Sequence, residues 1–187
     1  MRNVSGEREE IFTMPDEIYF VGYVDGVFYF QDRGKYIDNE CICDTTLFAF
    51  TVGENDLLPL VVIPGLSDGD TMYNDAKIEN FESCGDWLVM SAGHYYGTGN
   101  FFHGEILVVK KDGSELHSLP DSYGTNYWFI MDGWIYYNSD WNPDIGYENY
   151  AGLFRIQPAD EKPQIIGDHK RIISCMNGNI YYYSKAY

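Results

Sequence analysis

The chain is poor in basic residues and has no long apolar run. The chain has 12 Lys and Arg residues and 29 Asp and Glu residues, which gives a formal net charge of −17 over 187 residues. That charge repels phosphate backbones and anionic lipids, so we expect no nucleic-acid partner. It would suit a basic protein partner or divalent cations, or serve as an acidic surface that suppresses self-association. No apolar run reaches 18 residues, so no membrane insertion is expected.

Cysteine is also scarce. Cys41, Cys43, Cys84 and Cys175 match no zinc-binding spacing, and a chain of this length does not need disulfides to fold. We expect buried structural thiols, with Cys84 and Cys175 in strands that lead into turns. A metal site at Cys41 and Cys43 with a distant third ligand is the alternative. The sequence therefore predicts no metal and no cofactor.

Familiar catalytic motifs are missing as well. The chain contains no Gly-x-Ser-x-Gly elbow, no His-Glu-x-x-His helix and no phosphate-binding glycine loop. We therefore predict no catalytic residues. The alternative is a propeller-type glycoside hydrolase or lyase, which needs two carboxylates at a set separation. Glu79 and Glu82 in one strand and Asp144 in a loop are the candidates for that alternative.

Aromatic residues and tight-turn dipeptides are abundant instead. The chain has 17 tyrosines and 11 phenylalanines. Four turn dipeptides each precede a short aromatic segment, at 25–26, 85–86, 132–133 and 177–178. Asp-Gly and Asn-Gly tolerate the positive φ of a two-residue hairpin loop, and Tyr, Phe, Trp, Ile and Val suit a half-buried strand. Each unit is therefore predicted to be a β-hairpin.

The spacing of these turns predicts four-stranded units. Successive turns lie about 45 to 60 residues apart, the length of one propeller blade. Apolar third strands are expected from Leu47, Ile106 and Leu153, about 20 residues after their turns. A fourth segment then ends in Ile63-Pro64-Gly65, Leu119-Pro120-Asp121 or Ile166-Gly167-Asp168. The fold class predicted is all-β.

The N-terminal segment aligns with the end of such a unit. Residues 6–16 match residues 111–121 without a gap, so the chain is expected to begin inside a repeat. N-terminal strands would complete the blade that the C-terminal hairpin begins. Because a repeat buries its apolar face only against neighbours, we predict one propeller-like domain, 1–187, of four blades and monomeric. The alternative is an arc of a larger ring, a structural or interaction segment that closes as a dimer.

Several segments resemble a known group of domains. CGDWLVM, MDGWIYYNS and LFRIQPADEKPQII are similar to uncharacterised bacterial repeat domains related to the YWTD propeller of low-density-lipoprotein receptors. The resemblance implies a propeller without catalytic residues, and a surface or secreted binding module. The segment MRNVSGEREE lacks the apolar core of a signal peptide, so the sequence itself assigns no location.

The two edges of the predicted sheets differ in the length of their connections. One edge would carry short turns, and the other would carry loops 32–45, 92–104 and 139–151 with a crossover at 66–77. Function on a rigid scaffold concentrates in such loops. We predict a non-catalytic site for a carbohydrate, peptide or protein there, formed by Tyr95, Tyr96, Phe101, His103, Trp141, Asp144 and Tyr147. The alternative is that these aromatic residues fold back and cap the blade ends.

The crossover contains a cluster of oxygen ligands. Asp68, Asp70, Asn74 and Asp75 faintly resemble a calcium-binding loop. They lack the twelve-residue ligand pattern and its terminal Glu, so we expect a solvated acidic turn and no calcium.

Overall fold

The protein is built from β-strands joined by turns. The computed structural model describes residues 17–32, 42–54, 56–65, 74–75, 77–96, 101–125, 127–139, 152–167 and 170–184. These residues form strands and turns without a helix, which confirms the predicted all-β class. Across these ranges, therefore, no helix of a length and hydropathy suited to crossing a membrane occurs.

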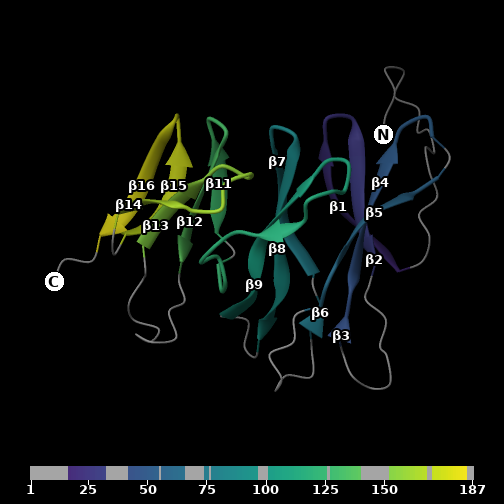
Figure 1. The fold of residues 1–187 in the computed structure, drawn as a ribbon, viewed down its shortest axis with the longest axis horizontal. Coiled ribbons are helices and arrows are strands. Elements are labelled where there is room, and N and C mark those ends of the chain that lie inside the picture. The colour runs from purple at the N-terminus through teal and green to yellow at the C-terminus, as the bar shows by residue number, and fades with distance from the viewer. Residues whose placement is uncertain are drawn as a thin grey trace, which may run out of the picture.

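Three antiparallel sheets of four strands follow one another along the chain, and a hairpin comes after them (Figure 1). The first sheet contains β1 (Ile18–Val24), β2 (Val27–Asp32), β4 (Thr45–Thr51) and β5 (Leu58–Ile63). The second contains β7 (Lys77–Cys84), β8 (Trp87–Tyr96), β9 (Phe101–Lys110) and β10 (His117–Ser118). The third contains β11 (Trp128–Met131), β12 (Trp134–Ser139), β13 (Gly152–Ile156) and β14 (Gln164–Gly167). The hairpin is β15 (Lys170–Met176) and β16 (Asn179–Ser184).

The hairpin turns form where the dipeptides predicted them. Both central residues have positive φ at three of the four turns, with values between 49° and 87° at 25–26, 132–133 and 177–178. At the remaining turn Gly85 alone has a positive φ, of 61°. Two consecutive residues at positive φ match the right-handed twist of the strands that they join. The predicted third and fourth strands also form, as β4, β9 and β13 and as β5, β10 and β14.

The sheets pack face to face through alternate residues. In β8, Leu88 and Met90 belong to a core shared with the first sheet, whereas Val89 belongs to a core shared with the third. β9 divides in the same way, because Val109 packs toward the first sheet and Val108 toward the third. Successive side chains of a strand point to opposite faces, so a sheet between two others must be apolar on both. This explains the near-continuous apolar runs in β8 and β9.

Buried polar contacts join neighbouring sheets. The side-chain oxygen of Gln31 accepts a hydrogen bond of 2.8 Å from the backbone N–H of Ile78, between the first and second sheets. Trp128 Nε1 donates to Ser91 Oγ at 2.6 Å, between the third and second sheets. Buried polar groups need a hydrogen-bond partner, so these two bonds fix how each sheet packs on the next.

The sheets stand side by side along the long axis of the molecule. Figure 1 shows the first sheet at one end of the stack and the hairpin β15–β16 at the other end. The strands predicted within residues 1–16 lie outside the described residues. The fourth blade and the closure of a ring therefore stay predictions.

Cys84 and Cys175 carry free thiols. Cys84 is buried in the core between the second and third sheets, as predicted, and burial raises the pKa of its thiol. Cys175 is half-buried, with its Sγ 3.9 Å from the sulfur of Met131. Cys41 lies outside the described residues, and Cys43 is placed by its backbone in β3 (Ile42–Cys43).

Candidate functional site

The two edges of the stack differ in the elements that they carry. The hairpin turns lie together at one edge, the upper edge in Figure 1. The second strand of each sheet ends at the other edge, at Asp32, Tyr96 and Ser139, and the third strands begin there. β3 and β6 (Asn74–Asp75) also lie at this lower edge. We call it the long-connection edge.

The predicted loop 92–104 is wrong in its extent. β8 continues to Tyr96 and β9 begins at Phe101, so residues 97–100 alone lie between the two strands. Gly93 pairs with Gly104, and His94 with His103, in an unbroken antiparallel register. The glycines suggested a loop. The aromatic residues around them favour extended backbone, however, and Gly93 and Gly104 are paired within the same ladder. The second sheet therefore extends as a two-stranded ribbon at this edge.

This ribbon carries four of the seven predicted ligand-binding residues. Tyr95 pairs with Phe102 and Tyr96 with Phe101, and His103 lies in the same ladder. The remaining three predicted residues, Trp141, Asp144 and Tyr147, lie outside the described residues. The structure thus brings Tyr95, Tyr96, Phe101 and His103 together on one element, and their role in binding stays a prediction.

The acidic crossover joins the neighbouring connection through its backbone. Asn74 pairs with Ile42 and Asp75 with Cys43, in a short parallel ladder between β6 and β3. Asp68 and Asp70 lie outside the described residues. Within the described ranges, no three side chains of His, Cys, Asp or Glu gather in a way that would hold a metal ion.

A hollow of about 250 Å³ lies between the first and second sheets. It is lined by Ile63, Pro64, Gly65, Ala92, Glu105, Leu107, Leu116, His117 and Ser118. Ala92 and Glu105 are register partners next to the Gly93–Gly104 pair, at the root of the ribbon. The hollow therefore lies beside the long-connection edge. Sequence analysis missed it, although the signature at 63–65 marks where β5 ends and its wall begins.

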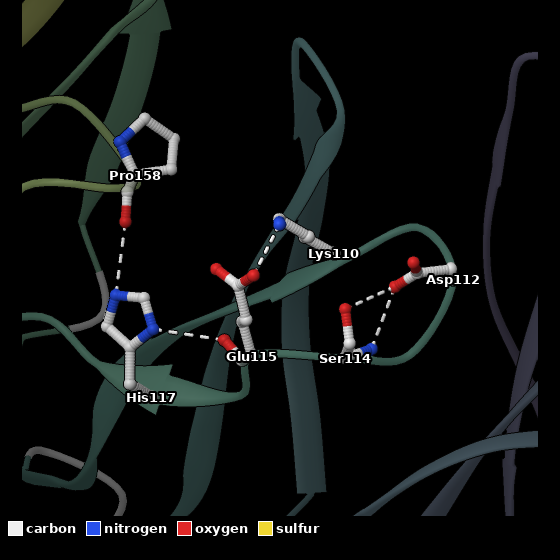
Figure 2. Close-up of polar contacts among 6 residues, drawn as sticks. All are labelled: Lys110, Asp112, Ser114, Glu115, His117 and Pro158. Atoms are coloured by element: carbon white, nitrogen blue, oxygen red, sulfur yellow. Dashed lines mark hydrogen bonds and ion pairs between the residues drawn. The ribbon is translucent and has the colours of Figure 1, made fainter.

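The lining of this hollow is mainly apolar, with Glu105 as its half-buried acidic group. His117 also lines it, but both nitrogens of its ring have partners (Figure 2). Nδ1 lies 3.0 Å from the carbonyl oxygen of Glu115, and Nε2 lies 3.1 Å from that of Pro158. Each ring nitrogen therefore contacts a backbone carbonyl oxygen. His117 thus ties β10 to the turn after β13, which assigns it a structural role.

The turn from β9 to β10 lies beside the hollow and is held by polar contacts of its own. Asp112 accepts hydrogen bonds from the Ser114 hydroxyl at 2.6 Å and from its N–H at 2.9 Å, and these bonds lower the pKa of the Asp112 carboxyl (Figure 2). Lys110 pairs with Glu115 across the same turn. Gly113 has a φ of 85°, and a Cβ there would lie 2.3 Å from the carbonyl oxygen of Leu60. The turn therefore packs directly on β5 of the first sheet.

The carboxylates of the hydrolase alternative lie on β7. Glu79 forms an ion pair with Lys77 at 2.7 Å. The side chain of Glu82 is largely exposed to solvent, yet the partial burial of its carboxyl raises the pKa of that group. A raised pKa is what a general acid needs, but the proposed partner Asp144 lies outside the described residues. No separation between two catalytic carboxylates follows from these residues.

Comparison with known proteins gives no relative: no family model, no curated protein and no solved structure matches the chain.

Proposed function

We propose that the protein is a non-catalytic binding module whose long-connection edge holds a carbohydrate, peptide or protein ligand. The observation that carries this proposal is the difference between the two edges. One has tight two-residue turns, and the other has the aromatic ribbon of β8 and β9 with a hollow at its root. Binding sites combine an apolar wall with a few polar groups, as Leu107 and Glu105 do here.

The size of the hollow limits what enters it. At about 250 Å³ it is smaller than the roughly 300–1,000 Å³ typical of sites that enclose a whole small ligand. It accommodates one sugar ring or one side chain of a longer ligand. The rest of that ligand would lie along the ribbon, where Tyr95, Tyr96, Phe101 and His103 are placed. Trp141, Asp144 and Tyr147 would contact it from the connection between β12 and β13.

We also propose that the sheets are blades of a propeller-like radial array. The face-to-face packing of successive four-stranded antiparallel sheets supports this arrangement. In this array, the N-terminal segment 1–16 would supply the third and fourth strands of the blade that the hairpin β15–β16 begins.

The test is a ligand screen with matched variants. Purified protein is applied to glycan and peptide arrays, and each hit is then measured by calorimetry. Ser118 is exposed and lines the hollow, so Ser118→Trp fills the hollow without entering the core. Lys162→Trp is the control, because Lys162 is exposed in the turn between β13 and β14, at the opposite edge. We expect Ser118→Trp to abolish binding and the control to retain it.

A second variant tests the ribbon. Tyr95→Ala with Tyr96→Ala and Trp141→Ala should remove binding while the circular dichroism spectrum is unchanged. Binding that survives both this variant and Ser118→Trp would contradict the proposed site.

The hydrolase or lyase alternative is supported by the raised pKa of Glu82. It predicts turnover of a polysaccharide that Glu82→Gln and Asp144→Asn abolish. If substitution of both carboxylates leaves a measured turnover unchanged, this alternative is wrong.

A further inference from the structure

One acidic side chain faces the hollow between the first and second sheets. Glu105 is half-buried and lines this hollow. The register of β8 and β9 is unbroken, so Glu105, Leu107 and Val109 lie on the same face of β9. Val109 belongs to the core shared with the first sheet, and Leu107 packs against that core. The carboxylate of Glu105 is therefore on the side of β9 that faces the first sheet.

This carboxylate has no partner among the described residues. The ion pairs between described side chains are Lys77 with Glu79, Lys110 with Glu115 and Lys111 with Asp25. Glu105 belongs to none of these pairs, and no hydrogen bond between described residues ends on its carboxylate. His117 also lines the hollow, but its two ring nitrogens contact the backbone carbonyl oxygens of Glu115 and Pro158. The negative charge of Glu105 is thus available to a ligand.

The surroundings of Glu105 strengthen its attraction for a cation. Apolar side chains make up most of the lining: Ile63, Pro64, Ala92, Leu107 and Leu116. A charge that is partly removed from water costs free energy unless an opposite charge pairs with it. An ion pair formed beside apolar groups is also screened less by water and salt than an ion pair at an open surface. A cation that enters the hollow therefore gains more than it would at an exposed carboxylate.

The same lining favours one form of cation. Besides Glu105 and the occupied ring of His117, the hydroxyl of Ser118 is the polar side-chain group that the lining offers. A sugar ring carries several hydroxyl groups, and each loses free energy when it is buried without a hydrogen-bond partner. Lysine and arginine side chains instead join an apolar stem to a single charged head. A volume of about 250 Å³ has room for one such side chain.

We propose that the hollow binds one lysine or arginine side chain of a basic peptide or protein, with Glu105 as its counter-charge. The apolar stem lies against Leu107 and Leu116, and the charged head donates hydrogen bonds to the Glu105 carboxylate. The net charge of −17 favours the approach of such a partner, because it raises the local concentration of cations. This inference rests on the binding function proposed above and narrows its ligand to a cationic polypeptide.

Four small probes test the nature of the ligand. Three are capped glycine pentapeptides with lysine, arginine or norleucine at the centre, and the fourth is the cationic sugar glucosamine. Norleucine keeps the stem of lysine without its charge. Binding is measured by NMR titration of the purified protein. We expect the lysine or the arginine peptide to bind at least about tenfold more tightly than the norleucine peptide and glucosamine.

Matched variants assign this preference to one carboxylate. Glu105→Gln keeps the shape of the side chain and removes its charge, so the lysine and norleucine peptides should then bind equally. Glu54→Gln is the control, because Glu54 is exposed in the turn between β4 and β5 and does not line the hollow. This control should keep the full preference for the charged peptides.

Two results would overturn the proposal. One is that neither charged peptide binds more tightly than the norleucine peptide and glucosamine, and the other is a preference that survives Glu105→Gln. If Glu105→Gln does not fold, salt provides the test on the wild type. Raising sodium chloride from about 50 mM to about 500 mM should weaken binding of the charged peptides alone, and an equal effect on the norleucine peptide also overturns the proposal.

The outcomes for the hollow and for its charge are separate. An array hit that Ser118→Trp abolishes and Glu105→Gln leaves unchanged means that the hollow binds its ligand without the charge. The pairing with a cation is then wrong, and the binding function stands. A hit that binds equally to the wild type, to Ser118→Trp and to the ribbon variant contradicts the binding site itself.

Discussion

Replacing Tyr137 by phenylalanine tests how the second and third sheets are joined. Tyr137 is fully buried, and its hydroxyl donates a 2.6 Å hydrogen bond to the carbonyl oxygen of Pro120. Its ring stacks on that of Phe154, with centroids 5.7 Å apart. Phenylalanine keeps the ring and its packing but removes the donor. At pH 8 we therefore expect Tyr137→Phe to lower the free energy of unfolding by about 1 kcal/mol, the net value of one such bond.

At alkaline pH the same hydroxyl should lower the stability of the folded state. Burial, and to a lesser extent the negative charge of Asp121, raise the pKa of Tyr137 above its ordinary value. The folded state therefore keeps a proton that the unfolded chain releases near pH 10. The stabilisation is complete below that pH and is lost as the pH rises, by about 1.4 kcal/mol per unit. Between pH 8 and 11 this group alone should cost the wild type about 1.4 kcal/mol, a loss that Tyr137→Phe avoids.

Urea denaturation at pH 8 and pH 11 measures both effects. The difference between wild type and Tyr137→Phe should shrink to about zero or reverse in sign at pH 11. Tyr29, whose pKa burial also raises, is present in both proteins, so its contribution cancels. Tyr19→Phe, at a residue 46% exposed, is the control and should not change the alkaline decline. A difference between wild type and Tyr137→Phe that is equal at the two pH values would refute the reasoning.

Two further contacts between sheets can be tested by substitution. Trp128→Phe and Ser91→Ala each leave one partner of a buried 2.6 Å hydrogen bond unsatisfied, so each should lower the free energy of unfolding by about 1–3 kcal/mol in chemical denaturation. The double variant should lose about 1 kcal/mol less than the sum of the two single losses. Strict additivity would show that the bond contributes nothing. Gly113→Ala should lower the free energy of unfolding by about 1–3 kcal/mol more than Gly53→Ala does. Both residues have positive φ, but the new methyl group meets the carbonyl oxygen of Leu60 only at position 113. Equal losses would mean that the turn moves away from Leu60 freely.

The sequence predicted the strands well because their signals are local. Asp25-Gly26 and Asn177-Gly178 predict hairpins whatever lies around them, since their backbone preference comes from the two residues themselves. The first strands were harder to interpret. β1, β7 and β15 each shift register at one point, for example between Phe20 and Gly22. A bulge of this kind breaks the alternation of faces and leaves no clear mark in the sequence.

The candidate site could be predicted only as an edge. Tyr96 and Phe101 suggested a loop because glycines surround them, whereas the register of β8 and β9 continues through Gly93 and Gly104. The hollow forms between the end of β5 and the strands β8, β9 and β10 of the next sheet, so it depends on how two sheets pack. A contact such as that of His117 with Pro158 joins residues that no local pattern relates.

The assignment of side chains to faces explains how the core of this protein is shared between its sheets. Leu88 and Val89 are adjacent in the chain, yet they pack against different sheets, so the second sheet needs a neighbour on both sides. Stacking between the first and third sheets satisfies that need for the second sheet. This alternation of faces is why the inner strands β8 and β9 are apolar at successive positions.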